Sequence, residues 1–83
     1  MHEVPIEDSI DLHTFQPQEI HIVVEEYLYQ AVKRKFREVR IIHGRGMGVQ
    51  REIVHSILTK HPSVVSFRDL PDRGSTMVQL KVI

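Results

Sequence analysis

The sequence lacks cysteine and tryptophan altogether, and among its 83 residues there are only four glycines and four prolines. A chain without cysteine forms neither disulfide bonds nor a zinc site built from thiolates. Lysine plus arginine and aspartate plus glutamate number 11 each, so the formal net charge is zero. Overall charge alone therefore cannot hold this chain along a stretch of nucleic acid backbone.

Long apolar runs are also missing, since no run approaches the roughly 20 residues that a membrane-spanning helix needs. The opening stretch, MHEVPIEDSIDL, has neither the basic start nor the apolar centre of a secretory signal. Hydrophobic residues make up 41% of the sequence, which is enough for one modest core. We expect a soluble, cytoplasmic, single domain over residues 1–83, without a membrane partner and with residues 1–7 as a flexible N-terminal segment.

Hydrophobic periodicity predicts six elements of secondary structure. Pro17 suits the first turn of a helix, and Glu19 suits its positive end. Three glycines interrupt the pattern in the middle of the chain, and PDRG marks a turn near its end. The predicted elements are a strand over 9–13, a helix over about 17–36, a strand over 39–43, a helix from 49 to about 60–62, and strands over 63–67 and 76–82.

This order predicts an α/β fold, a two-layer sandwich β-α-β-α-β-β with a mixed four-stranded sheet. Right-handed crossovers make the first strands parallel and place both helices on one face of the sheet. The last strand returns antiparallel through the PDRG turn. The core side of the first helix is predicted to carry Ile20, Val23, Val24, Tyr27, Leu28 and Ala31, and that of the second helix Val49, Ile53, Val54, Ile57 and Leu58.

A second apolar stripe lies on the first helix, away from the core side. Ile22, Tyr29 and Phe36 recur there every seven residues. Single exposed apolar residues are normal on a protein surface and need no function. The alternative is a partner surface, for example for weak self-association with another copy of the domain, and both interpretations stay open.

The segment HGRGMG, residues 43–48, is the most informative motif. A dinucleotide-binding turn needs its third glycine later, and 83 residues cannot hold the rest of that fold. A P-loop needs Gly-Lys followed by Ser or Thr, whereas Gly48 here precedes Val49 and Gln50. A structural turn that needs glycine only for positive φ angles explains one or two glycines, but not the histidine and arginine beside them. We therefore favour a loop that binds a phosphodiester.

Two histidines and two arginines are predicted to meet at this loop. His13 follows the first strand and His43 ends the second, so both imidazoles face the edge where the carboxyl ends of parallel strands converge. Arg45 projects from the loop, and Arg51 lies one turn into the next helix. Together with the backbone amides of Gly44, Gly46 and Gly48, these side chains describe a phosphate site.

The other histidines carry less information. His21 and His55 are predicted to be solvated on helix surfaces, and His61 to end the second helix before Pro62. His2 is terminal.

A metal site formed by His13, His43 and Asp11 is conceivable. However, Asp11 and His13 are two residues apart on a strand, so both can point to one face and hydrogen-bond to each other. We predict no tight zinc site from these three residues and no cofactor that the fold requires.

Four segments together resemble the Smr (small MutS-related) domain family, in its stand-alone bacterial form. They are IDLH, IIHGRGMGVQREIV, LTKHPSVVSF and STMVQL, and they run in order over residues 10–80. The resemblance implies a fold similar to the C-terminal domain of translation initiation factor 3. It also implies nicking endonuclease activity on DNA, binding or cleavage of RNA in some members, and recognition of branched or structured nucleic acid.

The resemblance also suggests roles for individual residues. The family motif L-D-L-H-G corresponds to residues 10–14 here, and H-G-x-G corresponds to residues 43–46. His13 would act as general acid or base, and His43 would transfer a second proton or contact the phosphate. Asp11 would either orient His13 or recruit a divalent cation, Mg²⁺ or Mn²⁺, for cleavage.

Two departures from the family pattern keep a second hypothesis open. Thr14 stands where the first motif usually has glycine, and a second glycine-rich loop of the form Gly-Gly-x-Gly-Ala-Thr is shortened to DRGST, residues 72–76. A domain without that loop could bind branched DNA or RNA without cutting it. A protein-interaction domain is a third hypothesis, and the sequence does not decide between DNA and RNA.

Overall fold

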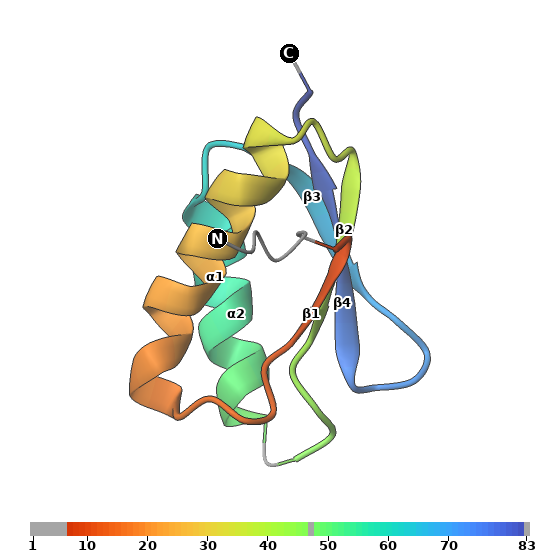
Figure 1. Ribbon diagram of the computed structural model, residues 1–83. Helices are drawn as coiled ribbons and strands as arrows, with labels where there is room; N and C mark the ends of the chain where they lie inside the picture. The colour runs from red at the N-terminus through yellow and green to blue at the C-terminus, as the bar shows by residue number, and fades with distance from the viewer. Residues whose placement is uncertain (1–6, 47, 83) are drawn as a thin grey trace.

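Six elements follow one another in the predicted order β-α-β-α-β-β (Figure 1). The computed structural model describes residues 7–46 and 48–82. Every predicted strand and helix forms, with boundaries shifted by a few residues. The elements are β1 (Ser9–Asp11), α1 (Pro17–Lys33), β2 (Glu38–Ile42), α2 (Val49–Lys60), β3 (Val64–Asp69) and β4 (Ser75–Leu80).

The four strands form one sheet in the order β1-β2-β4-β3. β1 runs parallel to β2, whereas β4 runs antiparallel to both of its neighbours. Both helices cover the same face of the sheet (Figure 1), so the predicted two-layer α/β sandwich is confirmed. These strand directions bring the ends of β1, β2 and β3 to the edge where β4 begins. That edge, at the lower end of Figure 1, carries the loops of the candidate site.

The core lies between the helices and the sheet. The predicted core side of α1 is buried apart from Val23, which is partly exposed and packs against the core. Val49 contradicts the prediction for α2, because it is the first helical residue after the glycine loop and stays 51% exposed. The buried hydrophobic residues are Leu12, Ile20, Val24, Tyr27, Leu28, Ala31, Val39, Ile41, Val54, Ile57, Leu58, Val78 and Leu80.

Local signals determine where α1 begins. Pro17 occupies the first helical position, where a missing N–H costs nothing. The Glu19 carboxylate accepts a hydrogen bond from the Gln16 N–H at 2.8 Å, which satisfies one donor ahead of the first turn. The negative charge of Glu19 also lies favourably near the positive end of the helix dipole.

The end of α1 corrects one prediction. The helix ends at Lys33 rather than near residue 36, because Lys35 adopts a left-handed φ of 62° and turns the chain. Phe36 therefore lies off the helix, its N–H donates to the Ala31 carbonyl, and its side chain packs against the core. Only Ile22 and Tyr29, 73% and 58% exposed, remain of the predicted three-residue stripe.

Most of the predicted flexible N-terminal segment, residues 1–6, lies outside the described residues. At Glu7 the chain is held to α1, since the Tyr27 hydroxyl donates a hydrogen bond to the Glu7 carbonyl at 2.8 Å. Burial raises the pKa of the Tyr27 hydroxyl, because a phenolate would lose its hydration there. Within residues 7–46 and 48–82, neither helix combines the length and the hydrophobicity that crossing a membrane requires.

Candidate functional site

The loop between β2 and α2 surrounds a small hollow. Gly44 and Gly48 have φ angles of 89° and 82°, in the left-handed region that other residues rarely adopt. Gly46 has no such φ, and a Cβ built on it would meet nothing within 4 Å. Neither backbone conformation nor packing thus explains the glycine at position 46. The hollow has a volume of about 150 Å³ and is lined by His43, Gly44, Gly46, Gly48, Val49, Gln50 and Arg51.

The short turn between β3 and β4 supports this glycine loop. The Gly74 carbonyl accepts hydrogen bonds from the N–H groups of His43 and Gly44, each at 2.9 Å. Arg45 Nε donates to the Asp72 carbonyl at 2.8 Å, which holds the predicted phosphate-binding side chain beside the loop. The shortened DRGST segment therefore still holds the glycine loop through three hydrogen bonds.

The Asp72 carboxylate stabilises the turn between β3 and β4. Its carboxylate accepts hydrogen bonds from the Gly74 N–H and the Ser75 hydroxyl, and it forms an ion pair with Arg40 at 2.5 Å. The Gly74 N–H, followed by the Ser75 hydroxyl and Arg40, lowers the pKa of Asp72. The carboxylate thus stays charged over the ordinary pH range, and the turn keeps its shape.

Asp11 and His13 form a local pair at the end of β1, as their spacing predicts. Asp11 Oδ1 lies 2.9 Å from the backbone N of His13 and 2.7 Å from its Nδ1. The backbone hydrogen bond from His13, and then the one from its ring, lower the pKa of Asp11. The His13 side chain is 69% exposed. Gln50 Nε2 donates to the Phe15 carbonyl at 2.8 Å, so this turn lies beside the start of α2.

The structure separates the two histidines that the sequence analysis placed together. Both lie at the predicted edge of the sheet, but His43 is 5% exposed and turns inward toward β4. Its Nε2 lies 2.9 Å from Thr76 Oγ1, and its Nδ1 lies 3.2 Å from the Gly44 carbonyl. Among the described residues, no hydrogen bond or ion pair joins His43 to His13.

A cluster of four side chains lies under the glycine loop: His43, His55, Asp69 and Thr76. Thr76 Oγ1 is at its centre, 2.9 Å from His43 Nε2, 3.3 Å from His55 Nε2 and 2.9 Å from Asp69 Oδ1. His55 Nε2 also lies 2.9 Å from Asp69 Oδ1. We call these residues the histidine cluster. It joins β2, α2, β3 and β4 at one point.

Arg51 flanks the histidine cluster. Its Nε donates to Asp69 Oδ2 at 2.9 Å, and its Nη2 contacts the same oxygen. Partial burial alone would raise the pKa of Asp69, but hydrogen bonds from Arg51, Thr76 and His55 outweigh it and lower the pKa to about 2. Arg51 does line the hollow at the glycine loop, where phosphate binding was predicted. Its strongest contact, however, is to Asp69.

The prediction that His55 is a solvated surface residue is wrong. Its side chain is 26% exposed, contacts Asp69 and Thr76, and packs edge-on against Phe67 with ring centroids 5.0 Å apart. One signal was available in the sequence, because His55 follows Arg51 by four residues and therefore lies on the same helix face. The predicted strand over 63–67 stops short of Asp69, but β3 extends to it and pairs it with Thr76.

Thr14, the first departure from the family motif, causes no strain. Lys35 and Arg73 are the non-glycine residues with positive φ in the described part of the chain, so Thr14 adopts an ordinary backbone conformation. The turn closes by a hydrogen bond from the Phe15 N–H to the Leu12 carbonyl at 3.0 Å. Glycine is therefore not required at position 14 for this turn to form.

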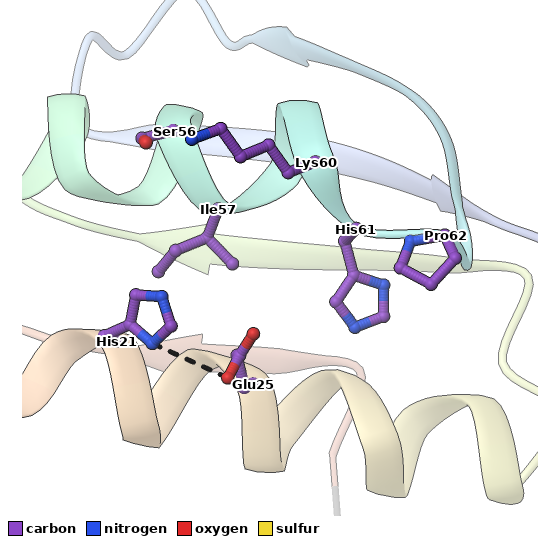
Figure 2. A pocket seen from close by; sticks show the side chains of 7 residues that line it. All are labelled: His21, Glu25, Ser56, Ile57, Lys60, His61 and Pro62. Carbon is purple, nitrogen blue, oxygen red and sulfur yellow. Dashed lines mark ion pairs between the residues drawn. The ribbon is translucent and has the colours of Figure 1, made fainter.

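A second cavity, of about 280 Å³, lies between the helices (Figure 2). His21 and Glu25 line it from α1, and Ser56, Ile57 and Lys60 line it from α2. His21 lies on the helix surface, as predicted, and its Nδ1 is 3.5 Å from Glu25 Oε2. His61 caps the end of α2, as predicted, and forms the wall together with Pro62. The cavity lining carries one carboxylate, from Glu25, and one ammonium group, from Lys60, so the two charges offset each other.

Sequence comparison relates the chain to larger proteins. It is 37% identical over 83 residues to Endonuclease MutS2 of Caldicellulosiruptor bescii. It is 36% identical over 80 residues to Endonuclease MutS2 of Staphylococcus saprophyticus subsp. saprophyticus. The alignments cover 95% and 92% of this chain but 10% of each relative. The chain therefore spans about a tenth of the length of the curated relatives it matches.

Two solved structures share the fold. The crystal structure of the Smr domain of Thermus thermophilus MutS2 has a TM-score of 0.83 and 28% identity, with 88% of this chain and 96% of that chain covered. YdaL, a stand-alone small MutS-related protein from Escherichia coli, has the same TM-score and identity, with 93% and 66% covered. A family model described as the Smr domain matches residues 10–81. The chain therefore belongs to the Smr domain family.

Proposed function

We propose that this domain binds the phosphate backbone of a nucleic acid at the glycine loop and cleaves a phosphodiester there with the help of Asp11 and His13. The observation that carries the proposal is the hollow at the start of α2. It is open above Gly46, a glycine that the fold itself does not require. A missing side chain at that position lets a ligand approach the backbone closely.

The charges around the hollow suit an anion. The first N–H groups of α2 have no partner within the helix, and the helix dipole places partial positive charge at this end. Arg45 is held beside the loop through its Nε, so the rest of the planar guanidinium can contact phosphate oxygens. Binding is thereby local to one or two phosphates, which is consistent with a formal net charge of zero.

The geometry of Asp11 and His13 suits general base catalysis. Asp11 Oδ1 accepts the proton on Nδ1 of His13, which leaves Nε2 as the basic nitrogen of a neutral imidazole. Because the side chain is exposed, Nε2 can take a proton from the water that attacks phosphorus, while the P–O bond to the sugar breaks and the leaving oxygen takes a proton from solvent. The name of the relatives, Endonuclease MutS2, supports this chemistry for the domain.

A divalent cation would fit beside Asp11 only together with a bound nucleic acid. Mg²⁺ and Mn²⁺ prefer several oxygen ligands, and Mg²⁺ is commonly held by one or two carboxylates plus phosphate oxygens. Asp11 would supply one carboxylate oxygen. The ion would stabilise negative charge on the reacting phosphate.

A binding experiment tests the glycine loop. Arg45→Gln is expected to weaken binding of labelled branched DNA about 3- to 10-fold at fixed salt, because it removes one phosphate contact. Arg34→Gln is the matched control, since Arg34 is an exposed arginine at the end of α1 that contacts Gln30. Gly46→Ala should weaken binding while the midpoint of thermal unfolding stays unchanged. Equal affinities for wild type, Arg45→Gln and Gly46→Ala would refute the proposed binding site.

A nicking assay tests catalysis separately. Supercoiled plasmid is incubated with wild type, His13→Ala and Asp11→Ala, with Mg²⁺, with Mn²⁺ and with a chelator. Wild type should nick in at least one metal, and both variants should lose most of that activity while remaining folded. Parallel assays on branched DNA, single-stranded DNA and RNA identify the preferred substrate.

The second candidate function is binding without cleavage. It is favoured by the burial of His43, which is 5% exposed and so keeps the second predicted catalytic histidine away from an incoming substrate. Binding that depends on Arg45, with equal background nicking in wild type and both variants, would establish this alternative.

A further inference from the structure

We infer that the histidine cluster is a binding site for one divalent transition-metal ion of the zinc type. His43, His55 and Asp69 each offer a ligand atom, and these three atoms all lie within 4.8 Å of one another. It is the one group of three such residues found in the described part of the chain. This site differs from the His13, His43 and Asp11 combination that the sequence analysis set aside, and it does not depend on the proposed nucleic-acid function.

The distances are close to those of tetrahedral coordination. Zinc binds histidine nitrogen and carboxylate oxygen at roughly 2.0–2.2 Å, which places the ligand atoms of a tetrahedron roughly 3.3–3.6 Å apart. Thr76 Oγ1 lies 2.9 Å from His43 Nε2, 3.3 Å from His55 Nε2 and 2.9 Å from Asp69 Oδ1. The hydroxyl is thus placed as a fourth, weaker ligand, and the shortest of these separations would lengthen by about half an ångström to admit the ion.

The balance of hydrogen-bond donors and acceptors in the histidine cluster also favours a bound cation. The Gly44 carbonyl can only accept, so a neutral His43 that donates to it carries its proton on Nδ1, and the lone pair of Nε2 then points at Thr76. The single Thr76 hydroxyl proton is donated to Asp69, so a nitrogen lone pair and an oxygen lone pair face each other at 2.9 Å. A metal ion satisfies both atoms. The neutral tautomer of His43 that donates its proton from Nε2 to Thr76 is the competing solution.

The surroundings of the ligands resemble an outer coordination shell. Histidines that bind metals usually donate their other ring N–H to a carbonyl or carboxylate, as His43 can to Gly44. Asp69 gives Oδ1 to the cluster, while Arg51 holds Oδ2 and so fixes the orientation of the carboxylate. Two imidazoles and one carboxylate select Zn²⁺, Mn²⁺, Co²⁺ or Fe²⁺ rather than Mg²⁺, which prefers oxygen. The partly exposed His55 and Asp69 provide the entry path.

Direct titration tests this inference without any activity assay. Metal-free protein is titrated with Zn²⁺ in competition with a chromogenic chelator, and with Co²⁺ followed by its visible absorption. We expect one equivalent of Zn²⁺ to bind, with a rise in unfolding temperature. His55→Gln should weaken binding at least 10-fold. His21→Gln, a control that changes an exposed histidine outside the cluster, should bind as wild type does.

A second measurement uses wild-type protein alone, so that misfolding of a variant cannot explain its result. In wild-type protein, substoichiometric Co²⁺ should broaden and shift the NMR signals of His43 and His55 most strongly, with smaller changes at His13, His21 and His61. The inference is overturned if no equivalent binds, if His55→Gln binds as tightly as wild type, or if signals outside the cluster respond first. The cluster is then a hydrogen-bond network closed by a proton. Nucleic-acid binding is measured with a chelator present, so the two proposals fail independently.

Discussion

Asp11 with His13 and Asp69 with His55 are two carboxylate–imidazole pairs at the same edge of the sheet, but they differ in their surroundings. The Asp11–His13 pair is local, two residues apart, and its imidazole is 69% exposed. The Asp69–His55 pair joins β3 to α2, and its imidazole is 26% exposed. Thr76, Arg51 and His43 surround it further.

This difference separates two roles that the same residue types can take. An exposed carboxylate–imidazole pair has little effect on the free energy of folding, and its imidazole can exchange a proton with an incoming substrate. Such a pair therefore suits general acid–base catalysis. A pair that is partly buried within a network contributes to stability and to positioning the loop above it. The two histidines are of the same residue type, so their burial, rather than their type, distinguishes the proposed catalytic role of His13 from the supporting role of His55.

Removing the centre of the histidine cluster should have the largest effect. Thr76→Val keeps the shape of a fully buried side chain but deletes the hydroxyl that contacts three polar atoms. We expect a loss of about 1–3 kcal/mol in the free energy of unfolding, because His43 and Asp69 lose a partner. Urea denaturation measures it. Thr14→Val, at an exposed turn, should change stability by less than about 0.5 kcal/mol.

Acid should weaken the Asp69 pair over a defined pH range. The pKa of Asp69 is lowered from 3.8 to about 2, so its stabilising contribution is fully present above about pH 4 and is lost as the pH falls toward 2. Wild type should lose stability over that range more steeply than Asp69→Asn. Thermal unfolding followed from pH 6 to 2 measures this difference. Superimposable pH profiles for the two proteins would contradict the network.

The exposed pair should give the smallest effect on stability. His13→Ala removes an exposed imidazole that forms an ion pair with Asp11, and it keeps the backbone hydrogen bond to the same carboxylate, so the free energy of unfolding should change by less than about 0.5 kcal/mol. Calorimetry or urea denaturation measures it. A loss above 1 kcal/mol would show that His13 is part of the structural framework, and the contrast between the two pairs would no longer hold.

Some of the site could be predicted because it depends on local order along the chain. The glycines of HGRGMG, the strand before them and the helix after them are neighbours in sequence. Asp11 and His13 are two residues apart, so the predicted contact between them is local, although it forms in the turn after β1 rather than on the strand. The strand order also brought His43 and the start of α2 to one edge, as predicted.

The histidine cluster could not be predicted in the same way. His55, Asp69 and Thr76 come from α2, β3 and β4, and their meeting depends on the register of the β3–β4 hairpin. Changing that register by one residue would turn Thr76 to the other face of the sheet. The predicted end of β3 at residue 67 left Asp69 outside the sheet, and His55 next to buried Val54 was taken for a surface residue.

Periodicity and glycine placement are enough to specify the β-α-β-α-β-β order, the parallel first strands and the glycine loop between β2 and α2, because each arises from short-range backbone preferences. Which imidazole is buried, which carboxylate it contacts and which arginine is occupied by an ion pair depend on side chains far apart in the chain. Those contacts form only when the helices pack on the sheet. Tertiary structure therefore assigned His43 to the interior and left His13 in solvent.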